Sequence, residues 1–107
     1  MEIKMENEKK YKGYIDENGN YIYPIIKKYY SCFDKTGNTY MGTFEADSDM
    51  RAIRMVEDAI NDPKSAIGKH PEDYRLDRLF IIDMRSGDIV DDNTKHIIEL
   101  KEMKNEQ

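Results

Sequence analysis

Histidine and cysteine are the side chains most often used for metal binding and nucleophilic catalysis, and this chain of 107 residues has two histidines and one cysteine. Each histidine has two acidic residues nearby: Glu72 and Asp73 follow His70, and Asp91 and Asp92 precede His96. A zinc site needs three or four ligands at a reproducible spacing, which this set does not supply. We therefore interpret His70 as a loop residue and His96 as a surface residue, and we expect no metal and no other cofactor.

Cys32 is the single candidate for a nucleophilic thiol. It lies within a β-rich run among aromatic residues, where cysteine usually packs as a small apolar side chain. The sequence places no cation beside it that would lower its pKa. The glycines are scattered singly, so they form no phosphate-binding loop. Because no acid, base and nucleophile come together, we do not expect an enzyme.

Tyrosine and lysine are concentrated in the first third of the chain. Single-stranded nucleic acid is held by such interleaved residues, because bases stack on aromatic rings while ammonium groups follow the phosphates. Tyrosine is also a good strand former with an amphipathic ring, and it is frequent in subunit contacts. Both alternatives stay open. The candidate nucleic-acid-binding residues are Lys10, Lys12, Tyr21, Tyr23, Lys27 and Lys28.

Composition limits the class of protein. The formal net charge is −5, which argues against sequence-independent binding of duplex DNA through a basic face. A single cysteine allows no intrachain disulfide and favours a reducing compartment. No segment approaches the roughly 20 apolar residues that cross a membrane. We expect an intracellular protein with one modest core and no membrane partner.

Two hairpins are predicted in the first half of the chain. Residues 11–28 form an N-terminal extension in which Asn18 and Gly19 make the turn and Pro24 limits the return strand. A second hairpin occupies residues 29–44. Its buried face should carry Tyr30 and Cys32, with a residue of the return strand, Tyr40 or Phe44, opposite them.

One amphipathic helix is predicted between a cap at Asp47 or Ser48 and about Asn61. Its apolar residues recur at helical spacing and make one stripe, formed by Ala52, Ile53, Val56, Ala59 and Ile60. The stripe should pack on a sheet that includes a strand from Tyr74 to Asp83. That strand is apolar on both faces at its centre, which indicates a central position. Residues 96–100 are a possible last strand.

The expected fold class is therefore α+β: a small antiparallel sheet of hairpins with one amphipathic helix packed on one face. We divide the chain into a flexible N-terminus at residues 1–10, the extension at 11–28, one α+β domain at 29–100, and a charged, frayed tail at 101–107.

Two sequence blocks stand out between the helix and the long strand. They are Asn61-Asp62-Pro63 and Lys69-His70-Pro71-Glu72-Asp73-Tyr74. Together with shorter matches between Tyr30 and Gly87, they resemble the small non-structural protein of gokushovirus-type microviruses, the fifth-open-reading-frame family of these single-stranded DNA phages. We expect the second block to be an ordered, mainly structural loop, because two prolines bracket the connection.

The resemblance implies a counterpart of the phage protein that acts late in infection, when replication switches to single-stranded genomes and DNA is packaged. It implies no catalytic activity and no place in the virion. Members are not known to carry the N-terminal extension, so its role rests on its own residues.

Two functions stay open from the sequence. The first is a phage accessory protein in the host cytoplasm that binds single-stranded viral DNA or the replication and packaging complex. The second is a homo-oligomeric interaction module that binds a viral or host protein and has no affinity for DNA. The tyrosines and lysines favour the first function, and the net charge favours the second.

Overall fold

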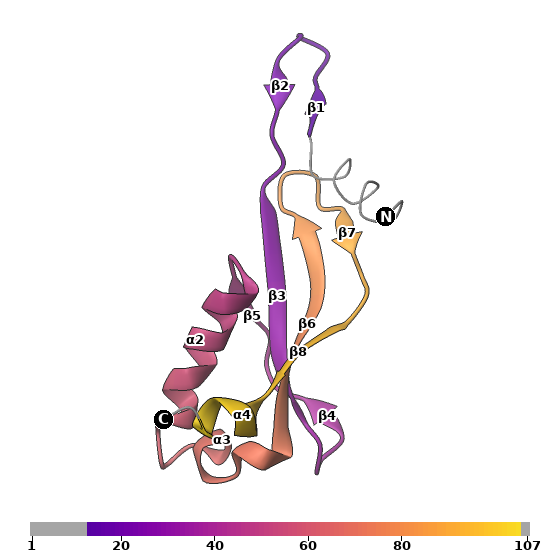
Figure 1. The fold of residues 1–107 in the computed structure, drawn as a ribbon. Helices are drawn as coiled ribbons and strands as arrows, with labels where there is room; N and C mark the ends of the chain where they lie inside the picture. Colours follow the sequence, from indigo (N-terminus) through magenta and orange to yellow (C-terminus); the bar gives the residue numbers. More distant parts are fainter. Residues whose placement is uncertain (1–12, 106–107) are drawn as a thin grey trace.

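The computed structural model describes residues 13–105, with side chains to residue 103, so the flexible start expected at residues 1–10 lies outside the described residues. The elements follow the chain in the order β1 (Tyr14–Ile15), β2 (Tyr21–Ile22), β3 (Ile26–Asp34), β4 (Thr39–Tyr40), β5 (Phe44–Ala46), α2 (Asp49–Ile60), α3 (Ala66–Lys69), the 3₁₀ turn η1 (Pro71–Asp73), β6 (Tyr74–Asp83), β7 (Ile89–Asp91), β8 (Lys95–Glu99) and α4 (Leu100–Asn105). This is an α+β fold, as the sequence predicts (Figure 1).

An antiparallel sheet is built around β3 and β6, which pair along their whole length. Strands β4 and β5 pair with the other edge of β3, while β7 and β8 pair with the other edge of β6. The central position predicted for the strand from Tyr74 to Asp83 is thereby confirmed. The register shifts between Tyr29 and Tyr30, where Leu79 of β6 is left as the extra residue of a bulge.

The N-terminal hairpin β1–β2 projects beyond the end of the main sheet (Figure 1). Its turn is closed by the Asp16 carboxylate, which accepts the backbone N–H groups of Asn18 and Asn20, both at 2.9 Å. Gly19 has a φ of +82°, a conformation that an L side chain rarely adopts. Since β3 begins at Ile26, the last three residues of the expected extension belong to the main sheet.

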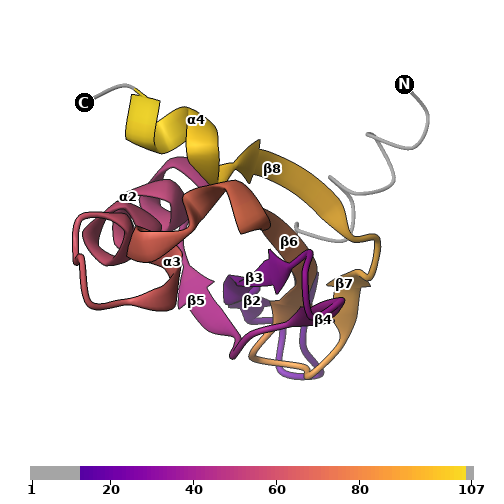
Figure 2. The ribbon, with the colours of Figure 1, turned by 90° about the horizontal axis from the view of Figure 1, so that it is seen from below.

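Helix α2 lies with α3 and α4 on one side of the sheet (Figure 2). Its N-terminus is capped by Ser48, whose side-chain oxygen accepts the Arg51 N–H at 3.1 Å. The buried stripe of α2 joins Tyr30 and Leu76 in one core. No described helix has the length and apolar character needed to cross a membrane.

The C-terminal segment corrects the sequence prediction. Residues from 101 onward were expected to form a frayed tail, but Leu100–Asn105 is helix α4. Leu100 is fully buried and Met103 is 3% exposed, so this helix closes the core. One turn and a half is too short for a helical period to stand out among charged residues.

The connection between α2 and β6 is helical rather than an open loop. Ser65 caps α3 by accepting the Gly68 N–H at 2.8 Å, and Pro71 starts the 3₁₀ turn. Gly68 is required by packing, because a Cβ there would lie 2.1 Å from the Asp62 carbonyl oxygen. The segment forms two short helical turns, and Tyr74 is buried at its end.

Candidate nucleic-acid interface

Tyr21 and Tyr23, two of the candidate nucleic-acid-binding residues, lie together on the projecting hairpin. Their ring centroids are 4.5 Å apart, and the rings are inclined by 53°. The side chains are 47% and 69% exposed. Ring faces left open to solvent in this way can stack on nucleotide bases.

The base of the hairpin is tied to the β6–β7 turn. The Asp83 carboxylate accepts the Ile25 N–H at 3.0 Å, and the Met84 N–H donates to the Ile25 carbonyl at 2.7 Å. The backbone N–H groups of Ile25 and Arg85 lower the pKa of Asp83. Arg85 also donates from Nε to the Tyr23 carbonyl at 2.8 Å, so its guanidinium is held at the backbone of the hairpin base. Sequence reasoning missed Arg85, because it is 62 residues away from Tyr23.

The structure separates the candidate lysines. The Lys27 ammonium lies 2.9 Å from the Glu45 carboxylate, and this hydrogen bond raises the pKa of Lys27. Lys28 lies on the opposite side of β3, in register with Ala46 and Ile81. Lys10 and Lys12 lie outside the described residues. Of the two candidate lysines that the structure describes, Lys27 and Lys28, it is Lys27 whose charge is offset by a carboxylate partner.

The two sequence blocks that carry the family resemblance form the ends and turns of the connection between α2 and β6. Asn61 ends α2, and Asp62 starts the next turn by accepting the Lys64 N–H on its side chain at 2.9 Å. Asp73 uses its backbone carbonyl to accept the Lys35 N–H at 2.9 Å, which fastens the second block to the β3–β4 turn. These contacts fasten the segment between Pro63 and Pro71 to α2 at one end and to the β3–β4 turn at the other.

Within the second block, His70, Glu72 and Asp73 have potential ligand atoms within 4.8 Å of one another. The side chains of His70 and Glu72 are 65% and 58% exposed, and their closest atoms are 3.6 Å apart. Asp73 is partly buried, and three neighbouring side chains provide one ligand too few for a closed zinc site. Lys69, in the same block, is also exposed.

The face of the sheet turned away from α2 carries aromatic pairs that sequence reasoning did not identify. We call it the open face. It is occupied by the residues of β3 and β6 that alternate with the core residues Tyr30, Cys32 and Leu76. Tyr29 stacks on Phe80 with centroids 5.1 Å apart, and Phe33 meets Tyr40 edge to face at 4.8 Å.

The structure shows which of the two aromatic residues of the return strand, Tyr40 or Phe44, faces the core. Phe44 stacks on Tyr30 on the helix side, with centroids 5.9 Å apart, whereas Tyr40 lies on the open face. The strand alternation alone left both alternatives open. Register decides between them, since Phe44 pairs directly with Tyr30 and Tyr40 pairs with Phe33.

A buried carboxylate organises the middle of the open face. Asp77 is 1% exposed, and its Oδ2 accepts hydrogen bonds from the Tyr40 hydroxyl at 2.6 Å and from Arg75 Nε at 3.1 Å. Its Oδ1 lies 3.3 Å from His96 Nδ1. Burial and the bond to Asp77 raise the pKa of Tyr40, and the bond to Asp77 raises that of Arg75. His96 is thus placed beside Asp77 and Glu99, not beside the acidic residues that precede it in the sequence.

Comparison with known protein families identifies a match over most of the chain. The profile of a family described as Phage ORF5 protein matches residues 27–103. No curated protein and no solved structure matches the chain. The matched range starts after the projecting hairpin, at the second residue of β3, and contains the rest of the main sheet, α2, α3 and the first four residues of α4.

Proposed function

Because the chain belongs to the phage ORF5 protein family, we propose that it is a non-enzymatic phage accessory protein that binds single-stranded DNA. Its place of action is the host cytoplasm late in infection, during single-stranded DNA synthesis or genome packaging. It engages the viral strand directly or within the replication complex.

The observation that carries this proposal is the exposed tyrosine pair on the hairpin. Tyr21 and Tyr23 offer two rings at 4.5 Å to solvent, and the Arg85 guanidinium is hydrogen-bonded to the backbone carbonyl of Tyr23. Stacking on aromatic rings contributes about 1–3 kcal/mol per base and does not depend on sequence. A duplex keeps its bases paired and stacked internally, so rings of this kind favour single strands.

The test is a titration of labelled oligonucleotides against the whole protein at several salt concentrations. We expect tighter binding to single strands than to duplex, and weaker binding as salt rises, because each neutralised phosphate releases counterions. The absence of salt-sensitive affinity for single strands at micromolar protein would refute DNA binding.

Two substitutions, each with a matched control, test whether the DNA-binding site lies at the hairpin. Tyr23→Ala should weaken binding by about 1–3 kcal/mol, whereas Met50→Ala, which removes an equally exposed side chain from α2, should not. Lys27→Glu, on the face of β3 that follows the hairpin, should flatten the salt dependence, with Lys64→Glu in the exposed α2–α3 connection as the matched charge reversal. Equal effects of test and control variants would place the site away from the hairpin.

A second function is favoured by a different observation. Ile15, Ile25 and Ile89 are 67%, 41% and 49% exposed, so apolar side chains accompany the tyrosines on and below the hairpin. Such a surface suits a homo-oligomer or a protein partner. Sedimentation of the wild-type protein and of Ile15→Ser distinguishes the two functions: self-association that the substitution abolishes, without DNA affinity, would establish the interaction module.

A further inference from the structure

We propose that single-stranded DNA continues from the hairpin across the open face of the sheet, where its bases stack on the Tyr29–Phe80 pair and on the Phe33–Arg75 pair. This inference rests on the proposed function, and it assigns that function a second, larger contact surface.

The open face has the chemistry of a stacking platform. Tyr29, Phe33, Tyr40 and Phe80 stand on adjacent strands and are partly exposed. The Arg75 guanidinium lies 4.3 Å from the centroid of the Phe33 ring, so the ring carries a planar cation on its face. Bases stack on guanidinium planes as well as on aromatic rings. No described helix covers these rings, because α2, α3 and α4 lie on the other side (Figure 2).

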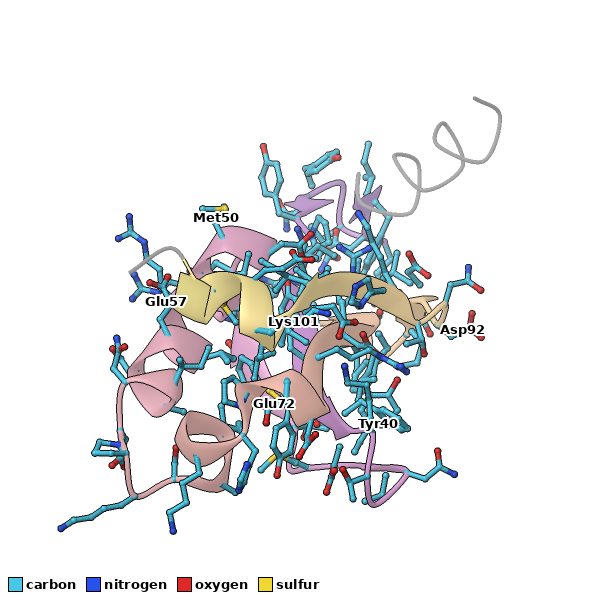
Figure 3. The ribbon with its side chains drawn as sticks, turned by 60° about the horizontal axis from the view of Figure 1, so that its bottom comes forward. Tyr40, Met50, Glu57, Glu72, Asp92 and Lys101 are labelled. Carbon is cyan, nitrogen blue, oxygen red and sulfur yellow. The ribbon has the colours of Figure 1, made fainter. Side chains whose placement is uncertain are left out.

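The platform is held in place before any ligand arrives. Asp77 accepts hydrogen bonds from both Tyr40 and Arg75 on one oxygen atom, which fixes the two side chains relative to each other. Figure 3 shows Tyr40 on the far side of the sheet from Met50 and Glu57 of α2. A preorganised surface loses less conformational entropy when it binds.

Basic side chains on this face are paired with carboxylates. Among the described residues, ion pairs join Lys27 to Glu45, Arg75 to Asp77, and Lys35 to Glu99. In each of these pairs a positive charge offsets a negative one, on a chain whose net charge is −5. Exposed ion pairs are weak, so Lys27 and Lys35, whose side chains are 34% and 36% exposed, can turn to phosphates at little cost.

The open face begins close to the hairpin site along the chain. Strand β3 starts three residues after Tyr23 and carries Lys27, Tyr29 and Phe33 along one face. A strand bound at the tyrosine pair thus reaches the platform without crossing the helices. We expect the full site to hold more nucleotides than the hairpin alone.

The experiment exchanges rings for leucine, which retains apolar packing but removes the stacking surface. Phe80→Leu and Phe33→Leu are compared with Phe44→Leu, the same substitution on the helix side, where the ring stacks on Tyr30. Fluorescence anisotropy is measured with thymidine oligonucleotides of about 4 and about 16 nucleotides, the range of site sizes for sheet-based binders. Melting temperatures are recorded for each variant.

We expect Phe80→Leu and Phe33→Leu to weaken binding of the longer oligonucleotide roughly 5- to 100-fold and Phe44→Leu to leave it within about twofold. The short oligonucleotide should be affected less, because the hairpin alone can hold it. Unchanged affinity of both open-face variants would overturn the inference while leaving DNA binding by the hairpin intact. Failure of the wild-type protein to bind would refute the proposed function itself.

A measurement on the wild-type protein covers the case in which a variant fails to fold. Photocrosslinking with an oligonucleotide that contains 5-iododeoxyuridine, followed by peptide mass spectrometry, should give adducts on the β3 and β6 peptides that carry Tyr29 and Phe80. Adducts confined to the hairpin peptide would overturn the inference.

Discussion

At the scale of single residues, Asp77 connects more of the open face than any other side chain described above. Its partners Tyr40, Arg75 and His96 come from β4, β6 and β8. Removing a carboxylate from such a place leaves its donors without a partner, and this costs more than the hydrogen bonds contribute while they are intact.

Asp77→Asn keeps the shape of the side chain and removes its charge. We expect the free energy of unfolding to fall by about 1.5–3 kcal/mol, the range for hydrogen bonds to charged groups. Urea denaturation measures the change. Asp58→Asn, an exposed carboxylate of α2, is the control and should change stability by less than about 0.5 kcal/mol. Equal effects of the two variants would contradict the structural role of Asp77.

Cys32 permits a pH prediction. Burial is the main cause that raises the pKa of its thiol from the ordinary 9.0 to about 11, with a smaller contribution from the Asp77 charge. Below pH 9 the thiol is neutral in both the folded and unfolded states. Between pH 9 and pH 11 the unfolded chain ionises first, so this group's contribution to stability is lost as pH rises through that window.

Alkylation provides the measurement. At pH 9, iodoacetamide should modify Cys32 much more slowly in the native protein than in urea, because the thiolate is the reacting form and the native thiol is protonated and 5% exposed. Glutathione in the same solution controls for reagent activity. Equal native and denatured rates would show that the thiol is accessible.

At the scale of elements, the connection from α2 to β6 depends on close backbone packing. The carbonyls of Ile60 and Asp62 approach Gly68 so closely that no side chain fits there. The two sequence blocks that carry the family resemblance lie on either side of Gly68, and together they form a tight turn of the chain.

Gly68→Ala should destabilise the protein by about 1–3 kcal/mol, because the new Cβ would lie 2.1 Å from a backbone oxygen and the turn must shift. Gly42→Ala is the matched control, since a Cβ at that position meets no atom within 4 Å. Thermal unfolding of both variants tests the difference. A Gly68→Ala protein as stable as Gly42→Ala would show that the turn is pliable.

At the scale of the whole molecule, the core is completed by the last described helix. Leu100 and Met103 join the same cluster as Tyr30 and Leu76, although they lie at the far end of the chain. The sheet, α2 and α4 therefore stabilise one another as a single unit.

Leu100→Ala should lower the free energy of unfolding by about 2–5 kcal/mol, a large share of the roughly 5–15 kcal/mol available to a small domain. Lys101→Ala, the exposed neighbour, should have little effect. Chemical denaturation measures the free energy of unfolding of the two variants. A near-zero change for Leu100→Ala would mean that α4 is not part of the cooperative core.

The sequence by itself determined the features that local periodicity controls. Helix α2 begins after Ser48 and ends before Asn61, and β6 runs from Tyr74 to Asp83, because a helical stripe and a continuous apolar run identify their elements without any partner. The hairpin turn at Gly19 and the buried state of Cys32 were predicted on the same local grounds.

Only the tertiary structure decided which distant groups meet. Register placed Tyr40 beside Asp77, 37 residues away, and put Phe44 rather than Tyr40 on the core side. Packing turned the charged C-terminal segment into a helix with a buried face. Such outcomes depend on side-chain pairs brought together by strand pairing, and no local pattern encodes the partner that a strand will choose.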